Sequence, residues 1–416
     1  MLRTVVVVGG GIIGLCAAVA LRDRGLEVTI LDAGQPGEGA SARNCGWITP
    51  LHSVPMPGPG VLGTSLRWLA RPESPLSIQP RLDPRLAFWL LRFAARCTGQ
   101  AYQQGTAALA ALNGRTFALF DAYTARGIAF EQYQTALLMA YLTHDALDKA
   151  AMRLRNVEAH DVGRYRVLDG DEARGQEPEL ASAVVGAIEL SDERYLRPET
   201  LVQGLVDYLT GRGVSIWAGQ PVTDLERTGS RVGTVRTPSN RFLCDAVLVA
   251  AGAWSDEVTR LLGRRLPLQA GKGYSMDFAP PPAMLTRSVE FAERSVAAVP
   301  YPGILRLCGT MELSGLNRSI NARRVAGIGR APRAYLRNWP VTLPDKTAWT
   351  GPRPLTPDGL PLIGRLPGFN NVYLATGHAM LGMTLGPSTG EAIAEEIATD
   401  RRPEILEPFD PARFGS

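Results

Sequence analysis

The chain has 416 residues and a net charge of +4, so it is long enough for two or three domains and carries no charge excess that indicates a nucleic-acid partner. Its apolar content of 45% is ordinary for a globular protein. The five cysteines form no Cys-x-x-Cys pair and the four histidines show no metal-ligand spacing, so we expect no metal site, no disulfide framework and reduced, cytoplasmic thiols.

The first predicted element is a strand at residues 5–8, because four consecutive valines suit a strand covered on both faces. Gly9, Gly11 and Gly14 follow as G-x-G-x-x-G and lead into an apolar helix that begins near Ile12. In such a turn the glycines permit a tight bend, the approach of a pyrophosphate, and close packing of helix on strand. The helix start directs free N–H groups at that phosphate.

A second strand at residues 28–31 ends at Asp32, near the spacing of the carboxylate that binds a ribose hydroxyl. Strand, glycine turn, helix and acidic residue together predict a dinucleotide-binding domain. A membrane-spanning helix from Val5 to Leu21 is not expected, because the run is short and contains adjacent glycines. A signal peptide is not expected either, because no cleavage site follows.

Helices are expected near residues 84–93, 107–126 and 198–209, followed by a strand at 214–217, a hairpin at 222–243 and a strand at 245–250. A sheet at 267–315, a strand at 371–376 and a helix at 387–398 complete the chain. Loop-like sequence occupies residues 34–44 and 50–60. The alternation of apolar residues in 267–315 predicts an antiparallel sheet.

Nucleotide-type sequence returns near the C-terminus, so the dinucleotide-binding domain is expected to be discontinuous. We assign to it residues 1–75, 193–266 and 346–416, and to a second, substrate-binding domain residues 76–192 and 267–345. The predicted fold class is α/β, with an α+β second domain.

Several separated motifs resemble the FAD-dependent D-amino-acid oxidase superfamily, and within it the bacterial D-amino-acid and D-hydroxyproline dehydrogenases. The motifs are Gly9–Asp32, Gly39–Gly46, Asp245–Trp254, Gly351–Gly364 and Ala375–Gly382, with Pro80–Leu91, Gly273–Ser275 and Gly309–Gly315 closer to that bacterial branch. The resemblance covers nearly the whole chain. It implies a Rossmann-like FAD-binding domain of the glutathione-reductase type and a substrate domain built on an antiparallel sheet.

The resemblance also implies which residues hold the cofactor. These residues would contact the pyrophosphate, the ribose, the adenine and the flavin ring of FAD. They are Gly9, Gly11, Ile12, Ile13, Gly14, Asp32, Ala33, Ala40, Ser41, Arg43, Asn44, Cys45, Gly46, Val222, Ala251, Gly252, Trp254, Gly377, His378, Met380, Leu381 and Gly382. Non-covalent FAD is expected, because Asn44 stands where covalent members carry a histidine and no cysteine follows Cys308. A helix starting near Pro387, with free N–H groups on Leu385 to Thr389, would stabilise negative charge on the reduced flavin.

Two residues are implied for the substrate. Arg353 stands where glycine oxidases and their relatives place the arginine that binds the substrate carboxylate, and Tyr274 offers a hydroxyl as a second contact. Met380 replaces a second carboxylate-binding arginine of glycine oxidase, so the pocket is expected to be more apolar and the substrate larger.

The implied activity is oxidative deamination of a D-amino acid or a cyclic imino acid of the D-proline or D-hydroxyproline type, by hydride transfer from Cα to flavin N5. A dehydrogenase that uses a quinone or another electron acceptor is favoured over an oxidase. The alternatives are a glycine- or sarcosine-type amine oxidase and an FAD-holding electron-transfer subunit of a larger complex. Homo- and hetero-oligomers both stay open.

A peripheral contact with the inner membrane is a further alternative for an otherwise cytoplasmic chain. The stretch Leu62–Leu91 is apolar and carries Arg67, Arg71, Arg81 and Arg85. Such a stretch suits a membrane surface, although we favour a buried helical face.

Overall fold

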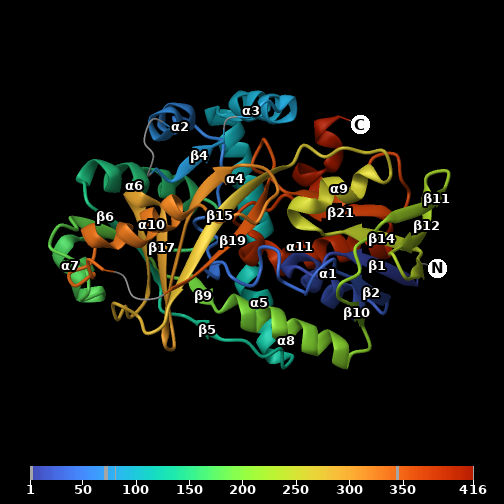
Figure 1. Cartoon of the computed structure of the whole chain (residues 1–416), viewed down its shortest axis with the longest axis horizontal. Coiled ribbons are helices and arrows are strands. Elements are labelled where there is room, and N and C mark those ends of the chain that lie inside the picture. Colours follow the sequence, from blue (N-terminus) through green and yellow to red (C-terminus); the bar gives the residue numbers. More distant parts are fainter. Residues whose placement is uncertain (1–2, 70–73, 80, 343–345, 416) are drawn as a thin grey trace.

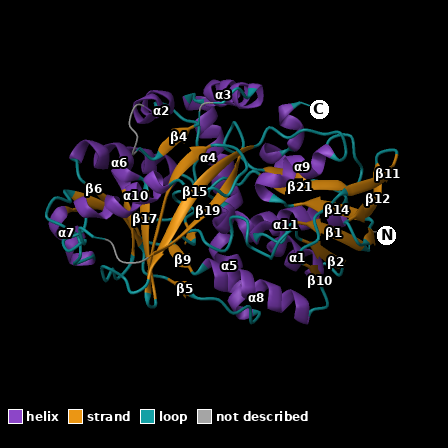
Figure 2. Ribbon diagram, viewed as in Figure 1, coloured by secondary structure: helices purple, strands orange, loops and turns teal. Residues whose placement is uncertain are grey.

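The computed structural model describes residues 3–69, 74–79, 81–342 and 346–415. It has two lobes (Figure 1): the lobe on the right contains the N-terminus, and the lobe on the left is built around a large sheet. Both lobes combine strands with helices (Figure 2), in agreement with the predicted α/β class.

The right-hand lobe contains a six-stranded sheet in the order β10-β2-β1-β14-β21-β20. These strands are Ser215–Trp217, Glu27–Leu31, Thr4–Val8, Ala246–Val249, Val372–Thr376 and Leu362–Arg365. All neighbours run parallel except β20, which is antiparallel to β21. β1 lies in the middle between β2 and β14, which explains why its four valines are buried on both faces.

Different layers cover the two faces of this sheet. Val5 and Val7 of β1 pack in one core with α1 (Ile12–Asp23), α8 (Pro198–Gly211) and α11 (Gly382–Thr399). Val6 and Val8 pack on the other side with the three-stranded sheet of β11 (Asp224–Thr228), β12 (Arg231–Arg236) and β13 (Arg241–Leu243). The segment 222–243 is therefore a hairpin extended by a third strand.

The start of α11 differs from the sequence expectation. The helix begins at Gly382, so Pro387 lies inside it, and Leu385 N–H already donates to Leu381 O at 2.8 Å. The expectation of free N–H groups on Leu385 to Thr389 is therefore wrong for Leu385; the free groups of the first turn belong to the residues from Gly382 onward. Close packing explains the glycines in this helix, since a Cβ on Gly390 would lie 2.7 Å from Cys16 O in α1.

The second lobe is built on a nine-stranded sheet in which β19-β15-β18-β17-β16-β6-β8-β7 form the main path and β4 pairs with β18. The strands are Lys346–Leu355, Gln269–Phe278, Ile304–Leu313, Val296–Tyr301, Ser288–Phe291, Leu137–Tyr141, Gly186–Leu190, Tyr165–Asp169 and, for β4, Leu76–Ile78. The antiparallel sheet expected in 267–315 is confirmed. The lobe also carries α6 (His144–Glu158), α7 (Gly170–Gln176) and α10 (Ala322–Arg330), and a small sheet joins β3 (Trp47–Ile48), β9 (Arg194–Leu196) and β5 (Gln132–Tyr133).

One strand departs from the expected division into domains. β19 falls in the segment 346–416 that we assigned to the dinucleotide domain, yet it pairs along its length with β15 of the large sheet. After β19 the chain enters β20 of the dinucleotide sheet. The chain therefore crosses between the two sheets after Leu355 rather than before Lys346.

The helical region between the lobes differs in two respects. The single helix expected at 107–126 is two helices, α4 (Gly99–Asn113) and α5 (Thr116–Ala125), separated at Gly114 and Arg115. The favoured burial of Leu62–Leu91 is also wrong for most of this stretch: α2 (Val61–Leu69) buries no residue, and α3 (Pro84–Arg96) buries only Leu86 and Trp89. Arg71 and Pro80 lie outside the described residues.

In the described part of the chain, no helix combines the length and apolar character needed to cross a membrane.

Candidate functional site

A cavity of about 2580 Å³ is lined by residues of both lobes. Its lining extends from Asp32 and Val222 beside the dinucleotide sheet to Arg353 and Met311 of the large sheet. The carboxyl ends of parallel strands at such an edge are where dinucleotides bind in this class of fold.

The glycine turn after β1 shows why the motif needs glycine. Gly9 has φ +111°, and a Cβ there would come within 2.5 Å of Ala250 O. A Cβ on Gly14 would come within 2.0 Å of Gly9 O, so this glycine brings α1 against the end of β1. Gly11 lines the cavity, and the next residue, Ile12, donates its N–H to Ser41 Oγ at 3.0 Å. The start of α1 therefore faces the cavity with a hydroxyl beside it.

Asp32 is held in a fixed orientation at the end of β2. Its Oδ2 accepts the N–H of Gly10 at 2.7 Å, and its Oδ1 accepts the N–H of Gly34 at 2.8 Å. A carboxylate has about four acceptor positions, so both oxygens can also accept ribose hydroxyls. Asp32 lines the cavity, as this role requires.

Most of the cofactor residues implied by the sequence come together around this one cavity. Its lining includes Gly9, Gly11, Ile12, Ile13, Asp32, Ala33, Ala40, Ser41, Arg43, Asn44, Cys45, Val222, Ala251, Gly252, Trp254, His378, Met380, Leu381 and Gly382. Gly14, Gly46 and Gly377 lie behind the wall, where they permit close packing: a Cβ would meet Gly9 O, Leu196 O and Thr356 Cγ2, respectively.

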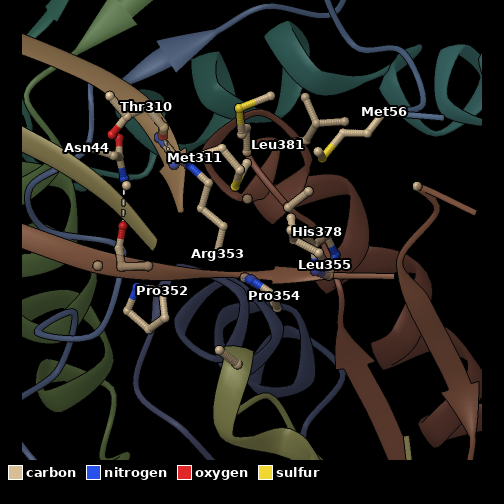
Figure 3. A pocket seen from close by; sticks show the side chains of 18 of the residues that line it. Asn44, Met56, Thr310, Met311, Pro352, Arg353, Pro354, Leu355, His378 and Leu381 are labelled. Carbon is tan, nitrogen blue, oxygen red and sulfur yellow. Dashed lines mark hydrogen bonds between the residues drawn. The ribbon is translucent and has the colours of Figure 1, made fainter. Parts of the chain in front are cut away.

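Arg353 projects from β19 towards Thr310 and Met311 (Figure 3). Its Nη1 donates to Thr310 O at 2.7 Å, and its guanidinium lies over Gly273, where a Cβ would approach Nη1 to 2.2 Å. No carboxylate within the described residues forms an ion pair with it. Burial lowers the pKa of Arg353, although a guanidinium stays protonated in proteins. An arginine in a cavity wall without a counter-charge can bind a ligand carboxylate through two parallel hydrogen bonds.

Tyr274 also lines the cavity, but its hydroxyl is bonded to another side chain. Its hydroxyl donates to Glu312 Oε2 at 2.9 Å, and Glu312 Oε1 lies 3.1 Å from Lys272 Nζ. The three side chains are buried. Successive residues of a strand point to opposite faces, so Tyr274 faces away from Gly273 and from the guanidinium packed on it. Its side chain anchors β15 to β18 through this network. Burial, and to a lesser extent the neighbouring carboxylate of Glu312, raises the pKa of Tyr274.

The sequence led us to expect an apolar pocket from Met380 and implied Leu381 as a cofactor contact, but it did not single out Met56, Met311 or Leu355. Met56, Met311, Leu355 and Leu381 lie around the pocket in Figure 3. The first three belong to an apolar cluster together with Leu86 and Trp89. Gly271 makes room for this wall, since a Cβ there would come within 2.3 Å of Met311 Sδ. Met380 is 58% exposed. No local sequence signal marks Met56, which lies in a proline-rich loop.

His378 is buried beneath the cavity. One ring nitrogen, Nε2, is 3.0 Å from Thr389 Oγ1, and burial lowers the pKa of His378 to about 3. Burial therefore favours the neutral ring, which lies beside the Thr389 hydroxyl. In the described residues, no cluster of three His, Cys, Asp or Glu side chains is arranged to hold a metal ion.

The start of α1 that faces the cavity, the oriented carboxylate of Asp32 and the long cavity suit an extended dinucleotide. Fold and site together define a dinucleotide-binding protein of two-lobed architecture.

Comparison with known proteins agrees with this class. Residues 4–396 match the family model of the FAD-dependent oxidoreductases termed DAO. The chain is 33% identical to a D-amino acid dehydrogenase of Methylobacterium sp. (strain 4-46), over 99% of both chains, and 31% identical to one of Xanthobacter autotrophicus, over 96% of both. The glycine oxidase of Geobacillus kaustophilus matches the fold with a TM-score of 0.75 at 23% identity, over 99% of both chains. The L-proline dehydrogenase of P. horikoshii does so with 0.74 at 18% identity, over 99% of this chain and 97% of that one.

The chain belongs to the DAO family of FAD-dependent oxidoreductases. It is an enzyme whose cofactor is FAD, as the sequence predicted.

Proposed function

We propose that this enzyme oxidises a D-amino acid to the corresponding imino acid, which hydrolyses in water to a keto acid and ammonia. FAD supplies the chemistry of accepting a hydride from the substrate Cα at its N5. One observation carries the assignment: Arg353 lies in the wall of the cofactor cavity and, among the described residues, has no carboxylate partner.

The roles of the side chains follow from the site. Arg353 would bind the substrate carboxylate bidentately, and its bond to Thr310 O would hold the guanidinium in one plane. The apolar wall of Met56, Met311 and Leu355 would receive the substrate side chain and exclude water from the reacting carbon. Fixing the substrate at both ends presents one face of Cα, which is the requirement for stereoselectivity.

The substrate class is supported by two observations. The relatives at 31–33% identity are named D-amino acid dehydrogenases, and the wall beside Arg353 is apolar. Both favour an apolar D-amino acid or a cyclic imino acid such as D-proline or D-hydroxyproline over glycine. The amine is expected to react in its neutral form, and His378, buried with its pKa lowered to about 3, would not serve as its base.

We further propose a dehydrogenase that transfers its electrons to a quinone at a membrane surface. The exposed face of α2 and α3 supports this proposal, because Leu66, Phe88 and Leu91 are 70%, 57% and 69% exposed. Arg67, Arg85 and Arg92 lie on the same two helices. Apolar side chains flanked by arginines suit an interface with anionic lipid.

The test is an anaerobic titration of the purified holoenzyme with D- and L-amino acids, D-proline and its hydroxylated analogues, glycine and sarcosine. Bleaching of the flavin absorbance by D-amino acids or D-proline alone supports the proposal. Reduction by sarcosine with release of formaldehyde would assign the glycine- or sarcosine-type activity instead. No reduction by any amine would assign an electron-transfer subunit. Faster turnover with a quinone analogue than with oxygen distinguishes a dehydrogenase from an oxidase.

A further inference from the structure

The cavity that contains the dinucleotide site has an apolar rim on α2. Leu62, Leu66 and Leu69 of this helix line the cavity although all three are exposed. Met152 of α6 also lines the cavity and is exposed. We call the part of the cavity that is lined by α2, α6 and Glu290 the outer part. A single cavity therefore connects an apolar rim at the surface with the residues around the dinucleotide.

The chemistry of this rim favours an apolar ligand. Exposed apolar side chains that lie together commonly mark a contact with a ligand, a partner or a membrane. A free amino acid is charged at both its amine and its carboxylate, so it gains little from such a rim. Arg67 of α2 and Lys149 of α6 also line the cavity and are exposed. Apolar side chains beside basic ones suit an entrance that faces lipid.

Glu290 of β16 gives the outer part a polar group. Glu290 pairs with Ala297 of β17 and with Met139 of β6, and all three residues line the cavity. Its Oε2 is buried and, among the described residues, has no hydrogen-bond partner. Burial raises the pKa of Glu290, which favours the protonated acid that can donate a hydrogen bond to a carbonyl oxygen. An apolar ligand that carries a carbonyl group would satisfy this carboxyl group.

Glu290 is separated from the residue proposed to bind the substrate carboxylate. The guanidinium of Arg353 lies over Gly273 of β15, and two strands, β18 and β17, lie between β15 and β16. Three strand spacings place the backbones of Gly273 and Glu290 about 14 Å apart. The outer part of the cavity is therefore a second subsite, distinct from the one beside Arg353.

We propose that the outer part of the cavity binds a lipid-soluble quinone, which enters past α2 and hydrogen-bonds through a carbonyl oxygen to Glu290. This inference rests on the quinone acceptor proposed above and names its site. The reaction there is balanced: reduced FAD gives up two electrons and two protons and becomes FAD, and the quinone takes up both pairs and becomes a quinol. The quinone reaches this site without leaving apolar surroundings.

The first experiment measures binding and needs no turnover. The oxidised holoenzyme is irradiated with an azidoquinone that carries a decyl tail, and the labelled peptides are mapped by mass spectrometry. We expect label on α2, on α6 or on the strand that carries Glu290. An excess of decylquinone without the azide should prevent this labelling. Glu290→Leu should weaken that protection, whereas Glu290→Gln, which still donates a hydrogen bond, should retain it.

Two tryptophan variants of α2 test the route. Ser65 lines the cavity, so Ser65→Trp should narrow the rim. Gly63 lies on the same helix but is not a lining residue, and a Cβ there would meet open space, so Gly63→Trp is the matched control. Each enzyme is reduced with dithionite, and reoxidation is followed by flavin absorbance. Ser65→Trp should react several-fold more slowly with decylquinone but normally with ferricyanide, whereas Gly63→Trp should match the wild type with both.

The possible failures are distinguishable. Label confined to peptides outside the cavity, or a Ser65→Trp enzyme that decylquinone reoxidises as fast as the wild type, would overturn the site and leave the quinone acceptor in place. A reduced wild-type enzyme that decylquinone does not reoxidise would overturn the acceptor and this site with it. Dithionite supplies the electrons, so none of these outcomes depends on the proposed D-amino acid.

Discussion

The guanidinium of Arg353 occupies the space that a side chain on Gly273 would fill, at 2.2 Å from the position of its Cβ. The two residues lie on the neighbouring strands β19 and β15, so the missing side chain on one strand provides the room for the long side chain on the other. The first prediction follows: Gly273→Ala should displace the guanidinium, the flexible partner, rather than the sheet. We expect the KM for the substrate to rise by about tenfold or more while the free energy of unfolding changes little, measured by steady-state kinetics and urea denaturation.

Removal of the guanidinium itself should have a larger effect. Arg353→Ala is expected to retain FAD and its yellow colour but to weaken substrate binding by about 2–5 kcal/mol, because the carboxylate of the substrate loses its paired charge. Arg353→Lys keeps the positive charge but not the planar guanidinium, so its affinity for the substrate should lie between those of the wild type and Arg353→Ala. An unchanged KM in the alanine variant, in titrations that also record flavin content, would remove Arg353 from the substrate site.

The network of Tyr274, Glu312 and Lys272 should affect stability more than the chemical step. Tyr274→Phe removes one hydrogen bond from a buried carboxylate and should lower the free energy of unfolding by about 1–3 kcal/mol. Glu312→Ala leaves the buried Lys272 without its counter-charge and should cost about 3–5 kcal/mol. A Tyr274→Phe enzyme of normal stability whose kcat falls steeply would instead place the hydroxyl at the substrate.

His378 should make the protein less stable in acid. Its pKa is lowered from 6.5 to about 3 in the folded state, so below pH 6.5 the unfolded chain takes up a proton that the folded chain does not. Stability should therefore be fully present above pH 6.5 and fall as the pH drops towards 3, by up to about 1.4 kcal/mol per pH unit from this group. Urea denaturation at pH 5 and pH 7.5 should show a smaller loss for His378→Asn than for the wild type; equal losses would contradict the assignment.

The exposed face of α2 and α3 gives the final prediction. Leu66→Glu combined with Leu91→Glu should reduce sedimentation of the enzyme with anionic phospholipid vesicles several-fold. Met284→Glu is the matched control, because Met284 is also exposed, at 73%, but lies between β15 and β16. Equal binding of both variants and the wild type would show that the face does not contact lipid.

The dinucleotide motif was predictable because its signals are local. Strand, glycine turn and helix follow one another within a few residues, and Gly9, Ile12 and Asp32 lie as expected. The early start of α11 was not predictable in this way, because Gly386 and Pro387 disfavour a helix. The close approach of Gly386 and Gly390 to α1 explains why small residues are needed in this helix. Tertiary packing overrides local preference at this point.

The walls of the site were predictable to different degrees. Arg353 was expected in the site through its motif, and it lines the cavity. The bond from Tyr274 to Glu312 could not be expected, because it depends on where β18 shifts its register against β15 next to Lys272. The exposure of α2 and α3 was missed because an apolar face has the same periodicity whether it meets a core or a solvent boundary.

The route of the chain after Arg353 has a consequence for engineering. Pro354 O accepts the N–H of Ala379 at 2.9 Å, and Leu355 bridges to His378. The strand that carries Arg353 is therefore bonded to the turn after β21 before the chain enters β20. A hinge movement of one lobe would therefore move β19, with Arg353, and the turn at His378 and Ala379 as one unit. Chimeras that graft the second lobe of a relative should accordingly take residues 346–355 together with the large sheet. They should take His378 and Ala379, which bond to this segment, from the same parent.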